Sequence, residues 1–275
     1  MMSVLYVVGT PIGNLQDFSP RAVKTLREVD FIAAEDTRVT QKLLNHFEIK
    51  KSMVSYHEHN LRERGEMILS RILAGESCAV VSDAGMPCIS DPGEDLVKLC
   101  ADAGVPVRVV PGPSAAVSAL AISGLTTTRF TFEGFLSTTR KNRLEHLESL
   151  REEKRTMIFY EAPHKLPATL EDLKTFFGGE RRLSIARELT KIYEEVRRFT
   201  LDEAISFYET QKPKGEFVLV VEGKPKEEEE KLTLEQAVEF ARSLMTQGAK
   251  ATEAAKNAAK ETPFSKAEIY KKLLD

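Results

Sequence analysis

Apolar residues follow two alternating patterns along the first half of the chain. Short runs rich in β-branched residues, at 4–8, 31–34, 78–81 and 107–110, are apolar on both faces, which predicts buried strands. Between them, apolar residues at three- and four-residue spacing predict helices at 61–73 and 94–103, and Ser19-Pro20 starts another that extends to about residue 29. This alternation predicts a mostly parallel sheet covered by helices.

The pattern changes after the rigid segment Pro111-Gly112-Pro113, which we interpret as a domain boundary. Further strands are predicted at 130–132, 156–160, 183–186 and 216–221. The predicted fold class is therefore α/β. We expect an N-terminal α/β domain at residues 1–112 and a C-terminal α/β domain with a mixed sheet at 113–224.

Charged residues at 225–231 form a predicted linker, and the pattern from 232 to 275 is purely helical. Thr233 with Gln236, and Ser265 with Glu268, match the capping box that marks helix starts. Two interpretations of this tail stay open. It is either a helix-turn-helix-like segment that contacts nucleic acid or a helical hairpin that covers the second sheet.

The composition is that of a globular protein, with 42% hydrophobic and 29% charged residues. No run of about 18 apolar residues occurs and the first residues do not resemble a secretory signal, so we expect a cytoplasmic protein without a membrane segment. Cys78, Cys88 and Cys100 lack metal-ligand spacing, which fits a reducing compartment. Because the net charge is −3, contact with nucleic acid would depend on local basic patches.

Two loops after predicted strands have the composition of ligand-binding loops. Gly9 and Gly13 flank Pro11 at the end of the first strand, where open α/β sheets bind ligands, although the dinucleotide fingerprint and the P-loop are absent. Residues 82–93 contain two prolines, two glycines and two aspartates directly after a buried strand. Proline fixes the backbone, glycine admits a ligand, and Asp83 offers an acceptor.

Polar residues also follow the strand at 31–34, in the segment Glu35-Asp36-Thr37-Arg38. They are candidates for chemistry, but Asp36 or Thr37 is equally an N-cap of a helix that begins near Thr40.

A second polar segment, 56–60, places His57 and His59 on either side of a glutamate. A metal site would need a third ligand from far away, so no metal is predicted. Contacts with a polar substrate, or a helix cap at Asn60, are favoured instead.

Further along the chain, residues 160–165 and 186–191 follow predicted strands, and their charged side chains are alternatively surface ion pairs. Arg140, Lys141 and Arg143 form a local basic patch. Phosphate contact and a solvated helix face are equally open for this patch.

These ordered motifs resemble the ribosomal RNA small subunit methyltransferase I family, of the tetrapyrrole-methylase-like class. The residues that carry the resemblance are 9–14, 34–38, 57–60, 82–93, 111–115, 160–164, 188–191 and 215–217. It extends from residue 4 to about 223, and the tail resembles the family's C-terminal helix-turn-helix segment. Ser82 and Ala84 depart from the Gly-Asp-Pro sequence of the tetrapyrrole relatives, which favours ribosomal RNA as substrate.

The resemblance implies two α/β domains with S-adenosylmethionine in the cleft between them, and a homodimer. The implied reaction is methylation of a ribose 2′-hydroxyl of a cytidine in 16S ribosomal RNA, free or in the small subunit, with no DNA and no membrane as partner. The residues that it implies for cofactor binding are Pro11, Ser82, Asp83, Ala84, Gly85, Met86, Pro87, Ile89, Ser114, Ala115, Glu161, Ala162 and Ala186.

A ribose hydroxyl is a poor nucleophile, so a base or a cation near the acceptor oxygen should accelerate transfer. The candidates for these catalytic roles are Glu35, Asp36, Arg38, His57, Glu188 and Lys191, with Arg187 as a further cation. Asn60, Arg140, Lys141 and Arg143 are the predicted RNA contacts. Two alternatives remain: a methyltransferase acting on a tetrapyrrole, and a non-catalytic RNA-binding protein.

Overall fold

The computed structural model describes residues 3–225 and 233–274. The chain divides after Lys224 into two compact units, a large α/β unit and a helical tail. The predicted linker at 225–231 lies, apart from Pro225, outside the described residues. The predicted domain limits at 112 and 224 stay predictions.

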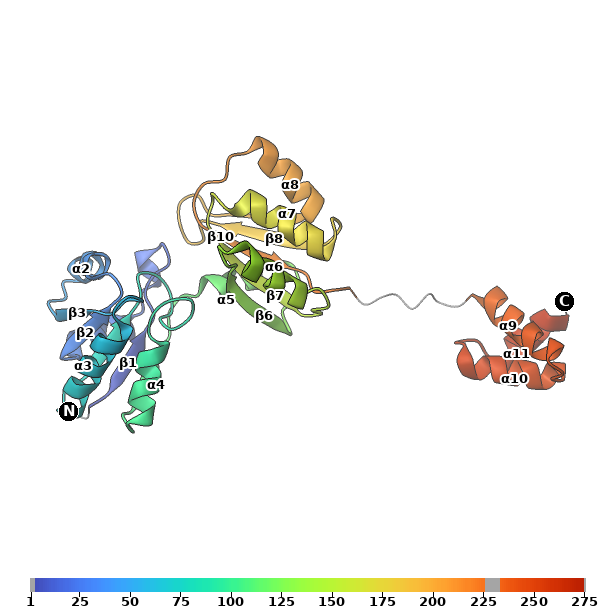
Figure 1. Cartoon of the computed structure of the whole chain (residues 1–275), viewed down its shortest axis with the longest axis horizontal. Coiled ribbons are helices and arrows are strands. Elements are labelled where there is room, and N and C mark those ends of the chain that lie inside the picture. Colours follow the sequence, from blue (N-terminus) through green and yellow to red (C-terminus); the bar gives the residue numbers. More distant parts are fainter. Residues whose placement is uncertain (1–2, 226–232, 275) are drawn as a thin grey trace. The chain divides into compact units, whose positions relative to one another are not determined.

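The first half of the large unit, coloured blue to green in Figure 1, contains a five-stranded sheet. Its strand order is β3-β2-β4-β1-β5, and all its strand pairs are parallel. Its strands are β1 (Leu5–Val8), β2 (Phe31–Ala34), β3 (Ser52–Ser55), β4 (Cys78–Val81) and β5 (Val107–Val110). The helices between them are the 3-10 turn η1 (Leu15–Asp17) and α1 (Pro20–Glu28), α2 (Thr37–His46), α3 (Leu61–Leu73) and α4 (Glu94–Asp102). This confirms the α/β fold class.

Side chains of the first sheet alternate between two cores because successive strand residues face opposite sides. Leu5 and Val7 pack with α3 and α4, whereas Val8 packs with α1 and α2. Since all five strands run the same way, their carboxyl ends meet at one edge. The loops that leave that edge contain most of the polar motifs of the N-terminal half.

The second half is a mixed sheet in the order β6-β7-β10-β8-β9, with β6 parallel to β7 and the other pairs antiparallel. Its strands are β6 (Phe130–Phe135), β7 (Thr156–Glu161), β8 (Arg182–Arg187), β9 (Glu195–Thr200) and β10 (Phe217–Val221). One face packs on α6 (Arg140–Ser149), α7 (Leu166–Phe177) and α8 (Leu201–Thr210), and the other packs on α5 (Ala115–Ile122).

Three local predictions differ from the structure. The strand at 107–110, expected to be buried, is an edge strand in which Val109 is 57% exposed. Strand β9 was not predicted, because its charged residues interrupt the apolar pattern that indicates a strand. Helix α2 begins at Thr37 rather than near Thr40, because Asp36 accepts a hydrogen bond from the Arg38 backbone N–H and acts as the N-cap.

The tail consists of α9 (Leu234–Thr246), α10 (Ala251–Glu261) and α11 (Lys266–Leu274). Both capping boxes form, at Thr233–Gln236 and at Ser265–Glu268. Alanines of the middle helix pack against Val238 and Ile269 in a core of the tail's own. The tail therefore has the small hydrophobic core of a helical unit.

Candidate functional site

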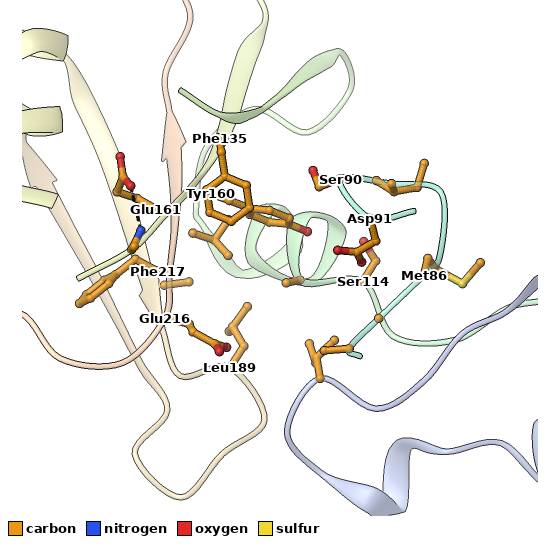
Figure 2. Close-up of a pocket in the computed structure, with 18 of the residues that line it drawn as sticks. Met86, Ser90, Asp91, Ser114, Phe135, Tyr160, Glu161, Leu189, Glu216 and Phe217 are labelled. Carbon is orange, nitrogen blue, oxygen red and sulfur yellow. Dashed lines mark hydrogen bonds between the residues drawn. The ribbon is translucent and has the colours of Figure 1, made fainter. Parts of the chain in front are cut away.

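A cavity of about 350 Å³ lies where the strand ends of the two sheets face each other (Figure 2). One wall is the loops after β1, β4 and β5 of the first sheet. The opposite wall comes from the second sheet, at the ends of β6, β7 and β8 and the start of the antiparallel β10. Its volume is within the range of small-molecule sites.

The loops after the neighbouring strands β1 and β4 are joined directly. Thr10 and Gly85 form an antiparallel bridge, with N–H···O distances of 2.8 and 3.1 Å. A Cβ on Gly9 would lie 2.7 Å from the backbone of Gly112, so the loop after β5 is in contact as well. The absence of a side chain at Gly9 and Gly112 is therefore what lets these backbones form one wall.

The loop at 82–93 has an unusual backbone. Cys88 and Ser90 have φ angles of 71° and 65°, which residues other than glycine rarely adopt. Such strain clusters at ligand sites, where surrounding structure holds the backbone in place. Gly93 is required as well, because a Cβ there would lie 2.6 Å from the Cys88 Sγ. The loop turns back on itself and directs Ser90 and Asp91 into the cavity (Figure 2).

Aromatic residues form much of the second wall. The Tyr160 hydroxyl accepts a hydrogen bond of 3.1 Å from the backbone N–H of Ala116, at the start of α5. The Tyr160 ring makes edge contacts with Phe132 and Phe135. A β-bulge between Phe132 and Gly134 changes the register of β6, so Phe135 reaches the cavity although its side chain is 58% exposed.

Most of the predicted cofactor residues lie together on this cavity. Those that line it are Ala84, Gly85, Met86, Ile89, Ser114, Ala115, Glu161, Ala162 and Ala186. Pro11, Ser82, Asp83 and Pro87 belong to the same loops but do not line it. The buried Ser82 supports the loop, since its carbonyl oxygen accepts a hydrogen bond of 3.2 Å from the Thr10 hydroxyl.

Several lining residues were not among the sequence candidates. These are Ile12, Ser90, Asp91, Phe135, Tyr160, Pro163, Leu189, Glu216, Phe217 and Val218. Ser90 and Asp91 belong to the loop that the sequence marked, so its composition was the available signal. Phe217 and Val218 had no such signal, because their strand pattern resembles that of any buried strand.

Three carboxylates from two loops lie beside the cavity: Glu35 after β2, and Asp83 and Asp91 in the 82–93 loop. The Glu35 carboxylate accepts a hydrogen bond from the Asp83 N–H, and the Asp83 carboxylate accepts one from the Asp36 N–H, both at 3.2 Å. Burial raises the pKa of Glu35 and of Asp83. Burial, and to a lesser extent the nearby Glu35 carboxylate, raises the pKa of Asp91 to about 6. Among the described residues, no ion pair within 4 Å neutralises these three groups.

Asp36 and Arg38 bind each other. The Arg38 guanidinium lies 2.6 Å from Asp36, and its hydrogen bonds hold the pKa of that carboxyl well below its usual range. Because Asp36 also caps α2, its carboxylate is occupied by structural contacts. The structure thus supports the capping interpretation of this residue.

Glu188 and Lys191 form a second paired site on the other wall. The Lys191 Nζ lies 2.9 Å from Glu188 and 3.0 Å from Glu216. The Lys191 hydrogen bond lowers the pKa of Glu188. This loop also packs against the first half of the unit, since a Cβ on Gly13 would lie 2.5 Å from the Lys191 Cγ.

His57 belongs to an acidic cleft of about 500 Å³ next to the cavity. The cleft is lined by Glu35, His57, Glu58, His59, Leu61, Ser90, Asp91, Pro92, Gly93, Glu94 and Asp95. Asn60 lies at the first position before α3, and its side-chain oxygen accepts a 2.9 Å hydrogen bond from the His57 N–H. Ser90 and Asp91 are common to the cavity and the cleft.

The predicted basic patch divides into two parts. Arg140 and Lys141 are exposed on α6. Arg143 is buried, with its Nε 2.5 Å from Asp172 and its Nη2 2.9 Å from the Thr169 hydroxyl. That hydroxyl in turn donates to Glu161 on the cavity wall. Arg143 thus connects α6 and α7 rather than facing solvent, because its guanidinium satisfies buried polar groups.

Within residues 3–225 and 233–274, no cluster of three or more histidine, cysteine, aspartate or glutamate residues is arranged to hold a metal ion. In the same described ranges, no helix has the length and apolar character needed to cross a membrane.

The cavity has the chemistry that a sulfonium-bearing nucleoside needs. Ile12, Met86 and Leu189 supply apolar surface for a flat ring. Asp91 supplies negative charge opposite a cation, while Ser114 and backbone groups of the 82–93 loop supply hydrogen-bonding partners. The residues present therefore fit S-adenosylmethionine.

Comparison with known proteins identifies the class. A model of the tetrapyrrole (corrin/porphyrin) methylases matches residues 4–205. Among solved structures, uroporphyrin-III-C-methyltransferase from Thermus thermophilus has a TM-score of 0.56 at 20% identity, covering 81% of this chain and 94% of that chain. Diphthine synthase has a TM-score of 0.60 at 15% identity, covering 80% and 89%. Fold and cavity define a protein of the tetrapyrrole methylase class.

The curated relatives identify one family within this class. Proteins named ribosomal RNA small subunit methyltransferase I are 49% identical in Synechocystis sp., over 100% of this chain and 98% of the relative, and 45% identical in Bacillus subtilis, over 98% and 93%. The relative in Thermotoga maritima is 50% identical over 81% of this chain and all of its own length. The chain belongs to this family of methyltransferases. The predicted family is confirmed.

Proposed function

We propose that this protein transfers a methyl group from S-adenosylmethionine to the ribose 2′-hydroxyl of a cytidine in 16S ribosomal RNA. The observation that carries the proposal is identity of 49% to a protein named ribosomal RNA small subunit methyltransferase I, over 98% of that relative's length. The cavity between the two sheets supports it, because it fits the methyl donor.

S-adenosylmethionine, when bound, supplies a methyl group already activated by a positively charged sulfur. The residues proposed to hold it are those of the cavity. Gly85 and Ala84 allow close backbone approach, Ala162 and Ala186 leave space for the ring, and Ser114 offers a hydroxyl. The protein's main task is then to align the acceptor oxygen with the methyl carbon, and such positioning is worth about 7–11 kcal/mol.

The acceptor is proposed to enter from the side of the acidic cleft. Five carboxylate residues line that cleft, so phosphate groups are repelled from it and a sugar and base are better suited. The exposed ring of Phe135 at the cavity offers a stacking surface for a splayed base.

Phosphates of the RNA are proposed to contact the exposed side chains of Arg140 and Lys141, together with the helical tail. Phosphate contacts position the RNA, whereas the cleft selects the acceptor. Arg143 is not included, because it is buried against Asp172.

A homodimer is also proposed. Val109 on the edge strand β5, Val117 and Ile122 on α5, and Phe130 on β6 are each at least 40% exposed. A sheet edge with apolar neighbours is a common site of association. Light scattering of the wild-type protein should give twice the chain mass, and Val117→Glu should lower it to one chain.

The proposed reaction is tested with small ribosomal subunits from cells that lack this activity, incubated with the protein and methyl-labelled S-adenosylmethionine. The expected product, after digestion of the RNA to nucleosides, is 2′-O-methylcytidine at one position. Label on a base, or none on RNA, would contradict the proposal. Transfer to a tetrapyrrole in a parallel reaction would support the alternative that the family description suggests.

A further inference from the structure

We propose that Asp91 is the general base that accepts the proton of the acceptor hydroxyl during methyl transfer. This inference rests on the proposed function and names a residue for one of its steps. Asp91 lies in the strained 82–93 loop and lines both the cavity and the acidic cleft. A base must contact both the methyl donor's site and the acceptor's site, and Ser90 is the other residue common to the two.

The direction of the side chain supports this role. Figure 2 shows the Asp91 carboxylate and the Tyr160 hydroxyl pointing toward each other across the cavity. Their proximity is also expressed in the pKa of Tyr160, which is raised by burial and further by the charge of Asp91. The Tyr160 hydroxyl is held by a hydrogen bond from the N–H of Ala116, which orients it on the cavity wall.

The surroundings of Asp91 keep its carboxylate basic. Burial and the Glu35 carboxylate raise its pKa to about 6, and Asp83 adds to this effect. Two other titratable groups lie close to it in the sequence: Cys88 in the same loop and Glu94 at the first position of α4. The acidic cleft contributes four more, which are His57, Glu58, His59 and Asp95. A base with a pKa just below neutral is largely deprotonated at pH 7 and still attracts a proton better than an ordinary aspartate.

The acceptor oxygen forms a bond to the methyl carbon while the carbon–sulfur bond breaks, and its electron pair stays on sulfur, which becomes a neutral thioether. The hydroxyl proton passes to the Asp91 carboxylate and from there to solvent through the open cleft. No oxidant, reductant or metal takes part in this step.

The sequence candidates for the base are less suited than Asp91. Asp36 is bound to Arg38, and Glu188 is bound to Lys191, so cations lower the pKa of both carboxyls. His57 and Glu35 line the acidic cleft but not the cavity, and Glu35 also accepts the Asp83 N–H. We assign Glu35 the role of a positioning residue, which keeps Asp91 basic by repulsion.

The test is a single-turnover assay with small subunits and S-adenosylmethionine at a series of pH values from about 5 to about 9. The wild-type rate should rise with pH, with its midpoint at about pH 6. Asp91→Asn should slow transfer by about a hundredfold or more and abolish this rise. Asp91→Glu should restore part of the rate.

Asp102→Asn is the matched control, because Asp102 is the last residue of α4, lines neither the cavity nor the cleft, and makes only an exposed pair with Lys98. It should keep the wild-type rate and midpoint. If Asp91→Asn transfers within about tenfold of wild type and keeps the acidic midpoint, Asp91 is not the base. If the wild-type protein methylates no subunit RNA at any pH, the proposed function fails instead.

Thermal unfolding gives a second readout that needs no substrate. Folding raises the pKa of Asp91 from 3.8, so the charged carboxylate destabilises the folded state above about pH 6. Asp91→Asn should therefore raise Tm at neutral and alkaline pH, and the gain should vanish below the ordinary aspartate pKa of 3.8. A difference in Tm that does not change with pH would contradict the environment on which the inference rests.

Discussion

Carboxylates in the loops on the two sides of the cavity differ in whether a cation is paired with them. On the side of the first sheet, Glu35, Asp83 and Asp91 have pKa values raised by burial. On the side of the second sheet, Glu188 is bound to Lys191 and its pKa is lowered. Groups of the first kind are suited to proton transfer and those of the second to holding a loop.

The difference arises from the elements that carry each group. The first group comes from loops after parallel strands, whose carboxyl ends meet at one edge of the sheet, and no lysine or arginine among residues 3–225 and 233–274 lies within ion-pair distance of it. The second lies in the β8–β9 loop, where Lys191 is only three residues from Glu188. A titratable side chain near a cavity is therefore not enough to predict a base, since its partners decide its role.

The largest effect on the folded protein is expected from Lys191→Met. It leaves the Glu188 carboxylate, only 17% exposed, without its cation, and should lower the free energy of unfolding by about 1–3 kcal/mol at pH 7. Because folding lowers the pKa of Glu188, this stabilisation is present above its ordinary value of 4.5 and is lost as pH falls through the lowered value. Urea unfolding at pH 7 and in acid measures the difference.

Lys141→Met is the control for that substitution, because Lys141 makes only a 3.8 Å surface pair with Glu145. It should change the free energy of unfolding by less than about 0.5 kcal/mol. An equal loss of unfolding free energy in the two lysine variants would show that the Lys191–Glu188 pair is no stronger than a surface contact. That result would contradict the structural role given to Glu188.

A smaller loss of stability is expected from Asp36→Ala. The variant removes the N-cap of α2 and the pair with Arg38, so Tm should fall by a few degrees. Asp36→Asn keeps a capping oxygen and should retain most of the stability. A shift in the pH midpoint of methyl transfer in Asp36→Asn would contradict the structural role given to this residue.

The smallest effect, and the most specific, is expected from Glu35→Gln. Removing the negative charge of Glu35 should lower the pKa of Asp91, because that charge raises it. The acidic midpoint of the rate profile should therefore move below the wild-type value, while S-adenosylmethionine affinity, measured by calorimetry, stays unchanged. An unchanged midpoint would show that the charge of Glu35 does not raise the pKa of Asp91.

The fold was predictable because the strand–helix alternation and the turn residues agree with each other. The loops at 9–14 and 82–93 were predictable because their prolines and glycines are concentrated directly after predicted strands. The raised pKa of Asp91 was not predictable, because it depends on burial in the folded protein and on the charge of Glu35 from another loop. Likewise, only tertiary structure shows that Arg143 faces Asp172 and that Val109 is on an edge strand.

For the tail, the sequence predicts the structure but not the role. Its helices and caps were predictable from local pattern, but its role depends on what it contacts. The identity of the methylated nucleoside therefore tests whether the acceptor is RNA more directly than deletion of the tail does.

A crystal structure of the protein with S-adenosylhomocysteine tests the central claim most directly, because it locates the methyl donor. Density should fill the cavity between Gly85 and Ala186, with the sulfur facing Asp91 and the acidic cleft. Density bound elsewhere, or a sulfur facing away from that cleft, would contradict the account.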